Sequence, residues 1–157
     1  MPNLGDSRPA NQAADAWGAL LRVHARLVPD LDRQLQAAHR LPLAWYDVLL
    51  ELNSGPDSRL RMTELGARVT LSRTRVSRLV DEMSAAGLVA REANPDDRRS
   101  AYAVLTANGR SVFRQAAPTY LAGIEELFGA ALTPAEVGCI KTGLDRVISR
   151  ATGRSPA

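Results

Sequence analysis

The sequence is poor in the residues that build covalent or metal-held scaffolds. It has a single cysteine, Cys139, which excludes an intrachain disulfide framework and a thiolate-rich zinc site. Its two histidines, His24 and His39, lack metal-ligand spacing, so we predict no metal site. No apolar run approaches the roughly 20 residues of a membrane span. The N-terminus lacks a basic stretch followed by an apolar core, and we expect a cytoplasmic protein without signal peptide or membrane contact.

Lysine is equally scarce, because only Lys141 of the 20 basic residues is a lysine. The arginines are spread unevenly along the chain. Residues 1–58 carry a net charge of −2, residues 59–99 of +3 and residues 100–157 of +2. Residues 59–80 alone hold six arginines and one glutamate. This basic middle segment predicts an anionic partner for that part of the chain.

The rest of the composition, 45% hydrophobic and 24% charged residues in 157, is typical of one soluble globular domain. Apolar positions spaced i, i+3, i+4, i+7 over residues 17–35 predict an amphipathic helix with a kink at Pro29. A second helix is expected from Pro42 to about Asn53. It is apolar on almost every side, which predicts burial on several faces.

The basic middle segment has the pattern of a helix-turn-helix. A short extended piece over residues 59–62 precedes a predicted helix from Glu64 to Val69, with Thr63 as its N-cap. A second helix, capped by Thr70 or Ser72, ends at Gly87. Its predicted buried positions are Val76, Leu79, Val80 and Met83. The arginines of this second helix lie off that stripe, so the outer face is basic.

After Gly87 the hydrophobic period changes from that of a helix to that of a strand. Residues 88–92 and 101–105 predict a β-hairpin, and residues 94–100 form its charged tip. Thr106 is the expected cap of a long helix that contains Pro118. The capping box Thr133-Pro134-Ala135-Glu136 begins a last helix, on which we expect Cys139 to be an inert, partly buried thiol.

Residues 72–109 resemble the signature of the multiple-antibiotic-resistance regulator (MarR) family of winged helix-turn-helix transcription factors. The matching residues are Val76-Ser77-Arg78-Leu79-Val80-Asp81-Glu82-Met83, Gly87-Leu88-Val89, Asp97-Arg98-Arg99, and Leu105-Thr106 with Gly109. Ser84 departs from the pattern, since the family often has glutamate there. In order of elements the resemblance covers residues 12–151.

The resemblance implies a mainly α (α+β) fold: a winged helix-turn-helix domain with N- and C-terminal helices that form a dimerisation region. Residues 42–106 would bind DNA, and residues 12–41 and 107–152 would form the homodimer interface. The whole of 12–152 would be one MarR-type domain, with tails at 1–11 and 153–157.

Two groups of side chains are the expected DNA contacts. The N-terminal half of a recognition helix reads base edges in the major groove. Here it offers Ser72, Arg73, Thr74, Arg75, Ser77 and Arg78. A hairpin tip can place an arginine in the minor groove. The alternative for both groups is a solvated basic surface.

In the wing we favour Arg99 as the inserted residue, oriented by Asp97 as in the family's Asp-x-Arg pattern. Asp96 with Arg98 is the competing register. Arg91 at the hairpin base either contacts the DNA backbone or pairs with Glu92 or Asp97. Three further candidates for phosphate contacts are Arg59, Arg61 and Arg68, for which surface solubility is an equal explanation.

The resemblance also implies a small, aromatic or anionic effector in a cleft beside the dimerisation helices. Candidates to line it are Trp17, His24, Trp45, Tyr46, Asp47 and Phe113, although aromatic residues at helical spacing are more often core. Asp47 is a charge within an apolar helix, so it either pairs with an arginine such as Arg68 or faces a ligand.

The implied function is that of a sequence-specific transcriptional regulator, in our interpretation a repressor. It would bind a pseudo-palindromic operator as a homodimer under the control of the effector. The alternatives are a winged-helix protein-interaction module and a nonspecific DNA-binding protein. The sequence has no HExxH, phosphate-loop, GxSxG or dinucleotide fingerprint, so we expect neither an enzyme nor a cofactor.

Overall fold

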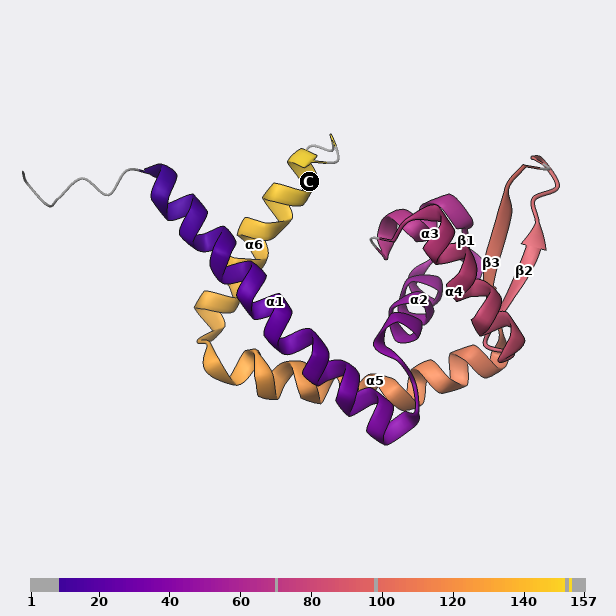
Figure 1. Cartoon of the computed structure of the whole chain (residues 1–157), viewed down its shortest axis with the longest axis horizontal. Helices are drawn as coiled ribbons and strands as arrows, with labels where there is room; N and C mark the ends of the chain where they lie inside the picture. Colours follow the sequence, from indigo (N-terminus) through magenta and orange to yellow (C-terminus); the bar gives the residue numbers. More distant parts are fainter. Residues whose placement is uncertain (1–8, 70, 98, 152, 154–157) are drawn as a thin grey trace, which may run out of the picture. The chain divides into compact units, whose positions relative to one another are not determined.

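The computed structural model describes residues 9–69, 71–97, 99–151 and 153 (Figure 1). Arg98, Thr70 and most of the two predicted tails lie outside the described residues. The chain divides after Tyr120 into two compact units. The fold is mainly helical with one three-stranded antiparallel sheet, which confirms the predicted fold class. None of the helices in the described ranges is long and apolar enough to cross a membrane.

The first helix, α1 (Pro9–His39), begins earlier than predicted and takes in the last three residues of the expected tail. Proline suits the first turn of a helix, because its missing N–H has no helical partner there. Pro29 lies inside α1, as expected. The carboxylate of Asp32 on α1 accepts the N–H of Leu43 at 2.8 Å, and so caps the next helix.

That next helix, α2 (Leu43–Ser54), is buried on several sides as predicted. Its buried residues are Leu43, Tyr46, Val48, Leu49 and Leu52. A turn of 3₁₀-helix, η1 (Pro56–Ser58), leads into strand β1 (Arg59–Arg61). Only Leu60 of this strand is buried. Burial of the apolar face of α2 against its neighbours therefore supplies much of the core.

The helix-turn-helix consists of α3 (Met62–Arg68) and α4 (Arg73–Ala85). The prediction that Thr63 caps α3 is wrong: the helix begins at Met62, after extended Arg61, and no side chain caps it. At α4 the prediction of Ser72 is confirmed, because its Oγ accepts the N–H of Arg75 at 3.3 Å. Gly87 follows α4 with a φ of 74°, a left-handed conformation that glycine adopts without strain.

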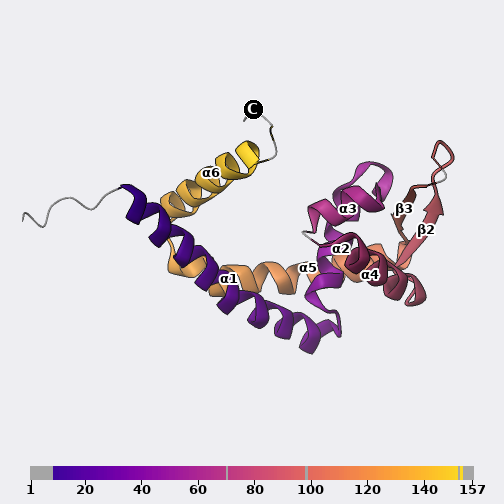
Figure 2. The same cartoon turned by 45° about the horizontal axis from the view of Figure 1, so that its top comes forward.

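Strands β2 (Val89–Ala93) and β3 (Ala101–Leu105) form the predicted hairpin, and β1 adds to it in the order β1-β3-β2. Both pairs are antiparallel. The hairpin extends away from helices α2–α4 (Figure 1, Figure 2). Large side chains that are almost fully buried come from α1, α2, α3, α4 and the sheet: Leu35, Val48, Leu49, Leu52, Leu60, Leu65, Val76, Val80, Met83 and Val89. Leu79, predicted to be buried, is half-buried.

Helix α5 (Ala107–Leu127) starts at a tight junction with the end of α4. The Thr106 hydroxyl donates to the carbonyl oxygens of Gly87 (2.8 Å) and Leu88 (2.9 Å), and it accepts the N–H of Gly109 (2.9 Å). Gly109 lies against the Leu88 carbonyl so closely that a Cβ there would be 2.0 Å from the oxygen. The predicted cap at Thr106 is confirmed. The close approach of the Leu88 carbonyl explains why residue 109 is a glycine.

The second unit holds the end of α5, the turn η2 (Gly129–Ala131) and α6 (Pro134–Ala151). The predicted capping box is confirmed, because Glu136 Oε2 accepts the Thr133 N–H at 2.8 Å. That backbone hydrogen bond, with one from the Thr133 hydroxyl, lowers the pKa of Glu136. No residue of α6 is buried, and Cys139 is exposed rather than partly buried as expected.

We expect Gly109→Ala to destabilise the fold by about 3 kcal/mol, because the added methyl group overlaps a carbonyl that cannot move without disrupting the junction. Equilibrium unfolding in urea measures the loss. The exposed neighbour Asn108→Ala is the control, and its effect should stay within about 0.5 kcal/mol. A Gly109→Ala variant as stable as Asn108→Ala would contradict the close approach at Leu88.

Candidate nucleic-acid interface

The N-terminal half of α4 presents a basic, exposed surface. Its apolar positions Val76, Val80 and Met83 are buried, which turns the intervening residues outward. The outward residues are Arg73, Thr74, Arg75 and Arg78, all exposed. Ser77 is half-buried, and Ser72 is engaged as the cap. The predicted recognition residues thus share the start of one helix, where unpaired backbone N–H groups also favour an anion.

The hairpin tip is held by a buried asparagine that the sequence analysis missed. Asn94 is 2% exposed, and its Nδ2 donates to Ser100 Oγ at 2.8 Å. Its Oδ1 accepts the N–H of Asp96 at 3.0 Å, as asparagine does in turns. The signal was present in the Asn-Pro-Asp start of the tip. These bonds fix Asn94, Asp96 and Ser100 relative to one another.

We expected Asp97 to orient the guanidinium group of Arg99, but its carboxylate binds the wing backbone instead. Its carboxylate accepts the backbone N–H of Arg99 at 2.9 Å. Within the described ranges it forms no ion pair with the Arg99 side chain. Arg99 is exposed, and Arg98, the other candidate for insertion, lies outside the described residues.

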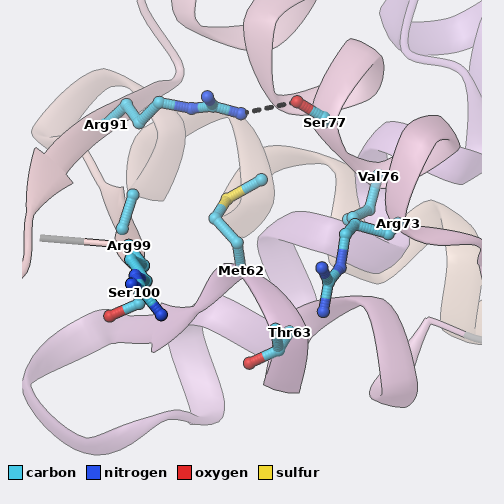
Figure 3. A pocket seen from close by; sticks show the side chains of 9 residues that line it. Met62, Thr63, Arg73, Val76, Ser77, Arg91, Arg99 and Ser100 are labelled. Atoms are coloured by element: carbon cyan, nitrogen blue, oxygen red, sulfur yellow. Dashed lines mark hydrogen bonds between the residues drawn. The ribbon is translucent and has the colours of Figure 1, made fainter. Parts of the chain in front are cut away.

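Arg91 makes neither of the pairings that we considered. Its Nη2 donates to Ser77 Oγ of α4 at 2.9 Å (Figure 3). The same Nη2 lies 3.4 Å from Oδ1 of Asp81, also on α4. The sheet register explains this outcome. Arg91 lies opposite buried Ala103, so it leaves the sheet on the side of α4, whereas successive residues such as Glu92 point to the other side.

A cavity of about 290 Å³ lies between α4, the start of α3 and the wing. Three arginines from different elements line it: Arg73, Arg91 and Arg99 (Figure 3). The remaining lining residues are Met62, Thr63, Val76, Ser77, Ser100 and Ala101. The fold therefore concentrates guanidinium groups from the recognition helix and the wing on one surface, as a polyanion requires.

Two further arginines are organised by a tyrosine on the opposite face of the sheet. The guanidinium carbon of Arg59 lies 4.9 Å from the centre of the Tyr102 ring, a cation–π distance. Arg61 Nε donates to the Tyr102 hydroxyl at 3.5 Å, and this hydrogen bond raises the pKa of Arg61. Both arginines are exposed and remain candidates for phosphate contacts.

Arg68, the third candidate, is already neutralised. It pairs with Glu64 at 2.8 Å and with Glu51 at 3.4 Å. The hydrogen bond that Arg68 donates to Glu64 is the main reason why the pKa of Arg68 is raised. It forms no pair with Asp47, so that explanation for Asp47 is wrong. An arginine shared by two carboxylates is a weak phosphate ligand.

A second cavity, of about 500 Å³, contains Asp47. It is lined by His24, Asp47, Leu50, Glu51, Arg68 and Val69, from α1, α2 and the end of α3. Two of the six predicted cleft residues, His24 and Asp47, therefore line the same cavity. Asp47 is half-buried and makes no hydrogen bond or ion pair with any residue in the described ranges.

The four aromatic candidates do not line this cavity. Tyr46 packs on Phe113, with ring centres 5.4 Å apart, and on Tyr120 at 4.5 Å. Both are core contacts, since aromatic rings at these distances stabilise a fold. Trp45 is half-buried, and Trp17 is 60% exposed on α1. The described residues contain no group of three His, Cys, Asp or Glu side chains that could hold a metal ion.

Comparison with known proteins identifies the family. A family model described as MarR family matches residues 40–100. The structure resembles Sco3205 of Streptomyces coelicolor, a MarR family transcriptional regulator solved in complex with DNA. The two are 30% identical with a TM-score of 0.80, over 96% of this chain and 94% of that one. The chain belongs to the MarR family. It is therefore a transcriptional regulator with a DNA-binding winged helix, and this is not a family of enzymes.

Other MarR structures agree with this assignment. AbsC, a MarR family transcriptional regulator from the same Streptomyces species, is 28% identical with a TM-score of 0.80, over 98% of this chain and all of that one. BpsR of Bordetella bronchiseptica, whose DNA binding is regulated by 6-hydroxynicotinic acid, shares the fold at 21% identity. Its TM-score is 0.72, over 94% of this chain and 97% of that one. No curated protein matched the chain.

Asp47 gives this MarR protein a pH-dependent stability. Burial, with a smaller contribution from the Glu51 charge, raises the pKa of Asp47 from 3.8 to about 6. Between those values the folded chain holds a proton that the unfolded chain releases. The contribution of Asp47 to stability therefore falls as the pH rises from about 4 to about 6.

We expect Asp47→Asn to raise the free energy of unfolding by about 1 kcal/mol near pH 7.5, after discounting for partial exposure, and by much less near pH 4. Urea unfolding at several pH values measures this difference. The exposed Asp15→Asn on α1 is the control and should leave the pH profile unchanged. A gain that is larger at pH 4 than at pH 7.5 would show that the carboxylate is stabilised by the fold.

Proposed function

We propose that this protein is a dimeric repressor that binds a pseudo-palindromic operator. A small-molecule effector either releases it from the operator or holds it there. The observation that carries the DNA-binding part is the shared surface of Arg73, Arg91 and Arg99 around one cavity. Guanidinium groups from the recognition helix and from the wing can then contact the same duplex. Residues 42–106 are the DNA-binding part in this proposal.

In the proposed complex, the start of α4 enters the major groove, where Arg73, Arg75 and Arg78 reach guanine edges and phosphates. The wing reaches the neighbouring minor groove with Arg99, whose backbone is fixed by Asp97. Arg59 and Arg61, stacked on and bonded to Tyr102, contact flanking phosphates. A dimer places two recognition helices about one helical turn apart, which requires a two-fold related operator.

The homodimer is supported by apolar side chains that the single chain leaves in solvent. Helix α6 exposes a stripe made of Val137, Ile140, Leu144, Val147 and Ile148. Helix α1 exposes Trp17, Leu20, Leu21 and Val23. Apolar side chains at these spacings on two helices are typical of an interface, and a second copy of the chain is the partner that we propose. Residues 12–41 and 107–152 form the dimerisation region.

The effector site in this proposal is the cavity that contains Asp47. The carboxylates of Asp47 and Glu51 face it, while Arg68 is occupied by Glu51 and Glu64. The resemblance implies an aromatic or anionic effector, and this arrangement favours a ligand that brings hydrogen-bond donors over an anionic one. An effector acts on DNA affinity only as far as it binds the DNA-competent arrangement more or less tightly than the other.

We expect Arg99→Ala to weaken operator binding about tenfold and to reduce the slope of log affinity against log salt by about 0.9, because one contact to the anionic duplex is lost. The measurement is a salt titration of binding to a fragment selected from genomic DNA, with unrelated duplex as competitor. The control is Arg114→Ala, an exposed arginine of α5 outside the interface. Equal affinities of Arg99→Ala and the unmodified protein would contradict the wing assignment.

We expect Val147→Glu to shift the protein from dimer to monomer, since the side chain is 64% exposed in one chain and would be buried against a second. Sedimentation velocity over a range of concentrations measures the dissociation constant, which should rise at least about tenfold. Thr142→Glu adds the same charge on the opposite side of α6 and is the matched control. A monomeric unmodified protein, or a dimer insensitive to Val147→Glu, would refute the proposed interface.

A further inference from the structure

One guanidinium group joins the wing to the recognition helix. Arg91 Nη2 donates to Ser77 Oγ at 2.9 Å (Figure 3) and lies 3.4 Å from Asp81 Oδ1. Ser77 and Asp81 are four residues apart, so they lie on the same face of α4, one turn from each other. In the part of the chain that the structure describes, Arg91 provides the only polar side-chain link between α4 and strands β2 and β3.

This link crosses a hollow. At the root of the hairpin, Leu88 and Val89 are buried and fix the first residues of the wing. Further along, the cavity of about 290 Å³ separates the wing from the start of α4. A gap carries no dispersion contacts, so packing cannot set the distance between the two elements there. The link through Arg91 spans this gap and adds to the pairing of β3 with β1, which ties the wing to α3.

Asp81 is unexpected on charge grounds alone. The helix that carries it bears three outward arginines, and an exposed carboxylate near a phosphate backbone repels DNA. Its side chain is 62% exposed, while that of Arg91 is 39% exposed. Among the described residues, the one ion pair that Asp81 forms is with Arg91. Its position suits a role within the protein rather than a contact with nucleic acid.

We propose that Asp81 is a positioning residue for operator binding, acting through Arg91 and Ser77 to hold the wing at a fixed angle to the recognition helix. The inference rests on the proposed DNA-binding function. Operator recognition needs α4 and the wing to enter neighbouring grooves together, and a preset angle removes the cost of ordering the wing on binding. Arg91 then serves the interface by holding the wing, in addition to its place on the basic surface around the cavity.

The test is Asp81→Asn, compared with Glu82→Gln. Both variants remove one negative charge from exposed, adjacent residues of α4, but Glu82 has no part in the link. Electrostatics alone predicts that both bind DNA slightly more tightly. Positioning predicts that Asp81→Asn lowers operator affinity about tenfold, the effect of losing one charge-assisted contact. Its salt slope should equal that of the unmodified protein, since no phosphate contact is lost.

Two further measurements separate positioning from a general loss of folding or charge. Affinity of Asp81→Asn for unrelated duplex should not fall, because nonspecific binding needs only the positive surface. In an Arg91→Gln background, adding Asp81→Asn should cause no further loss, because the link is already broken.

An Asp81→Asn variant that binds its operator as tightly as Glu82→Gln would overturn the positioning role and leave the proposed function standing. Failure of the unmodified protein to bind any selected duplex would instead refute the proposed function, and the positioning role with it.

Discussion

The winged domain depends on the threonine hydroxyl that joins the end of α4 to the start of α5. Thr106 bonds the carbonyls of Gly87 and Leu88 and caps the helix that follows through Gly109. Those residues fix where the hairpin leaves the helix-turn-helix and where it returns. Because β2 starts and β3 ends at this junction, the direction of the wing relative to α4 is set here first. The link from Arg91 to α4 refines it nearer the tip.

The elements that could be predicted from the sequence are those defined by local chemistry. Ser72, Thr106 and the Thr133 capping box act within a few residues of the helix starts that they define. Gly87 supplies a positive φ that other residues rarely adopt. The start of α3 was misplaced because no side chain caps it, so the sequence carries no signal at Met62. The start of α1 was placed late because residues 9–11 lack apolar periodicity.

The site was less predictable, since its contacts join residues far apart in the sequence. Choosing a partner for Arg91 required the strand register, which decides that it faces α4 and not Glu92. Arg68 and Arg59 look alike in the sequence. In the structure, two carboxylates neutralise Arg68, whereas Arg59 stacks on Tyr102. Asp47 was correctly singled out as unusual, but only the structure reveals a cavity in place of an arginine partner.

Helix α6 has a consequence for the amount of protein that a cell must make. It buries no residue within one chain, so its helical state gains little from the fold of a lone subunit. In the proposed dimer, the association free energy therefore also stabilises this helix. Formation of the α6 helix and dimerisation of the chain are then coupled in one equilibrium. The population of assembled regulators then rises with the square of the subunit concentration when the protein is dilute. A modest change in synthesis or degradation would be amplified at the promoter before any effector is present.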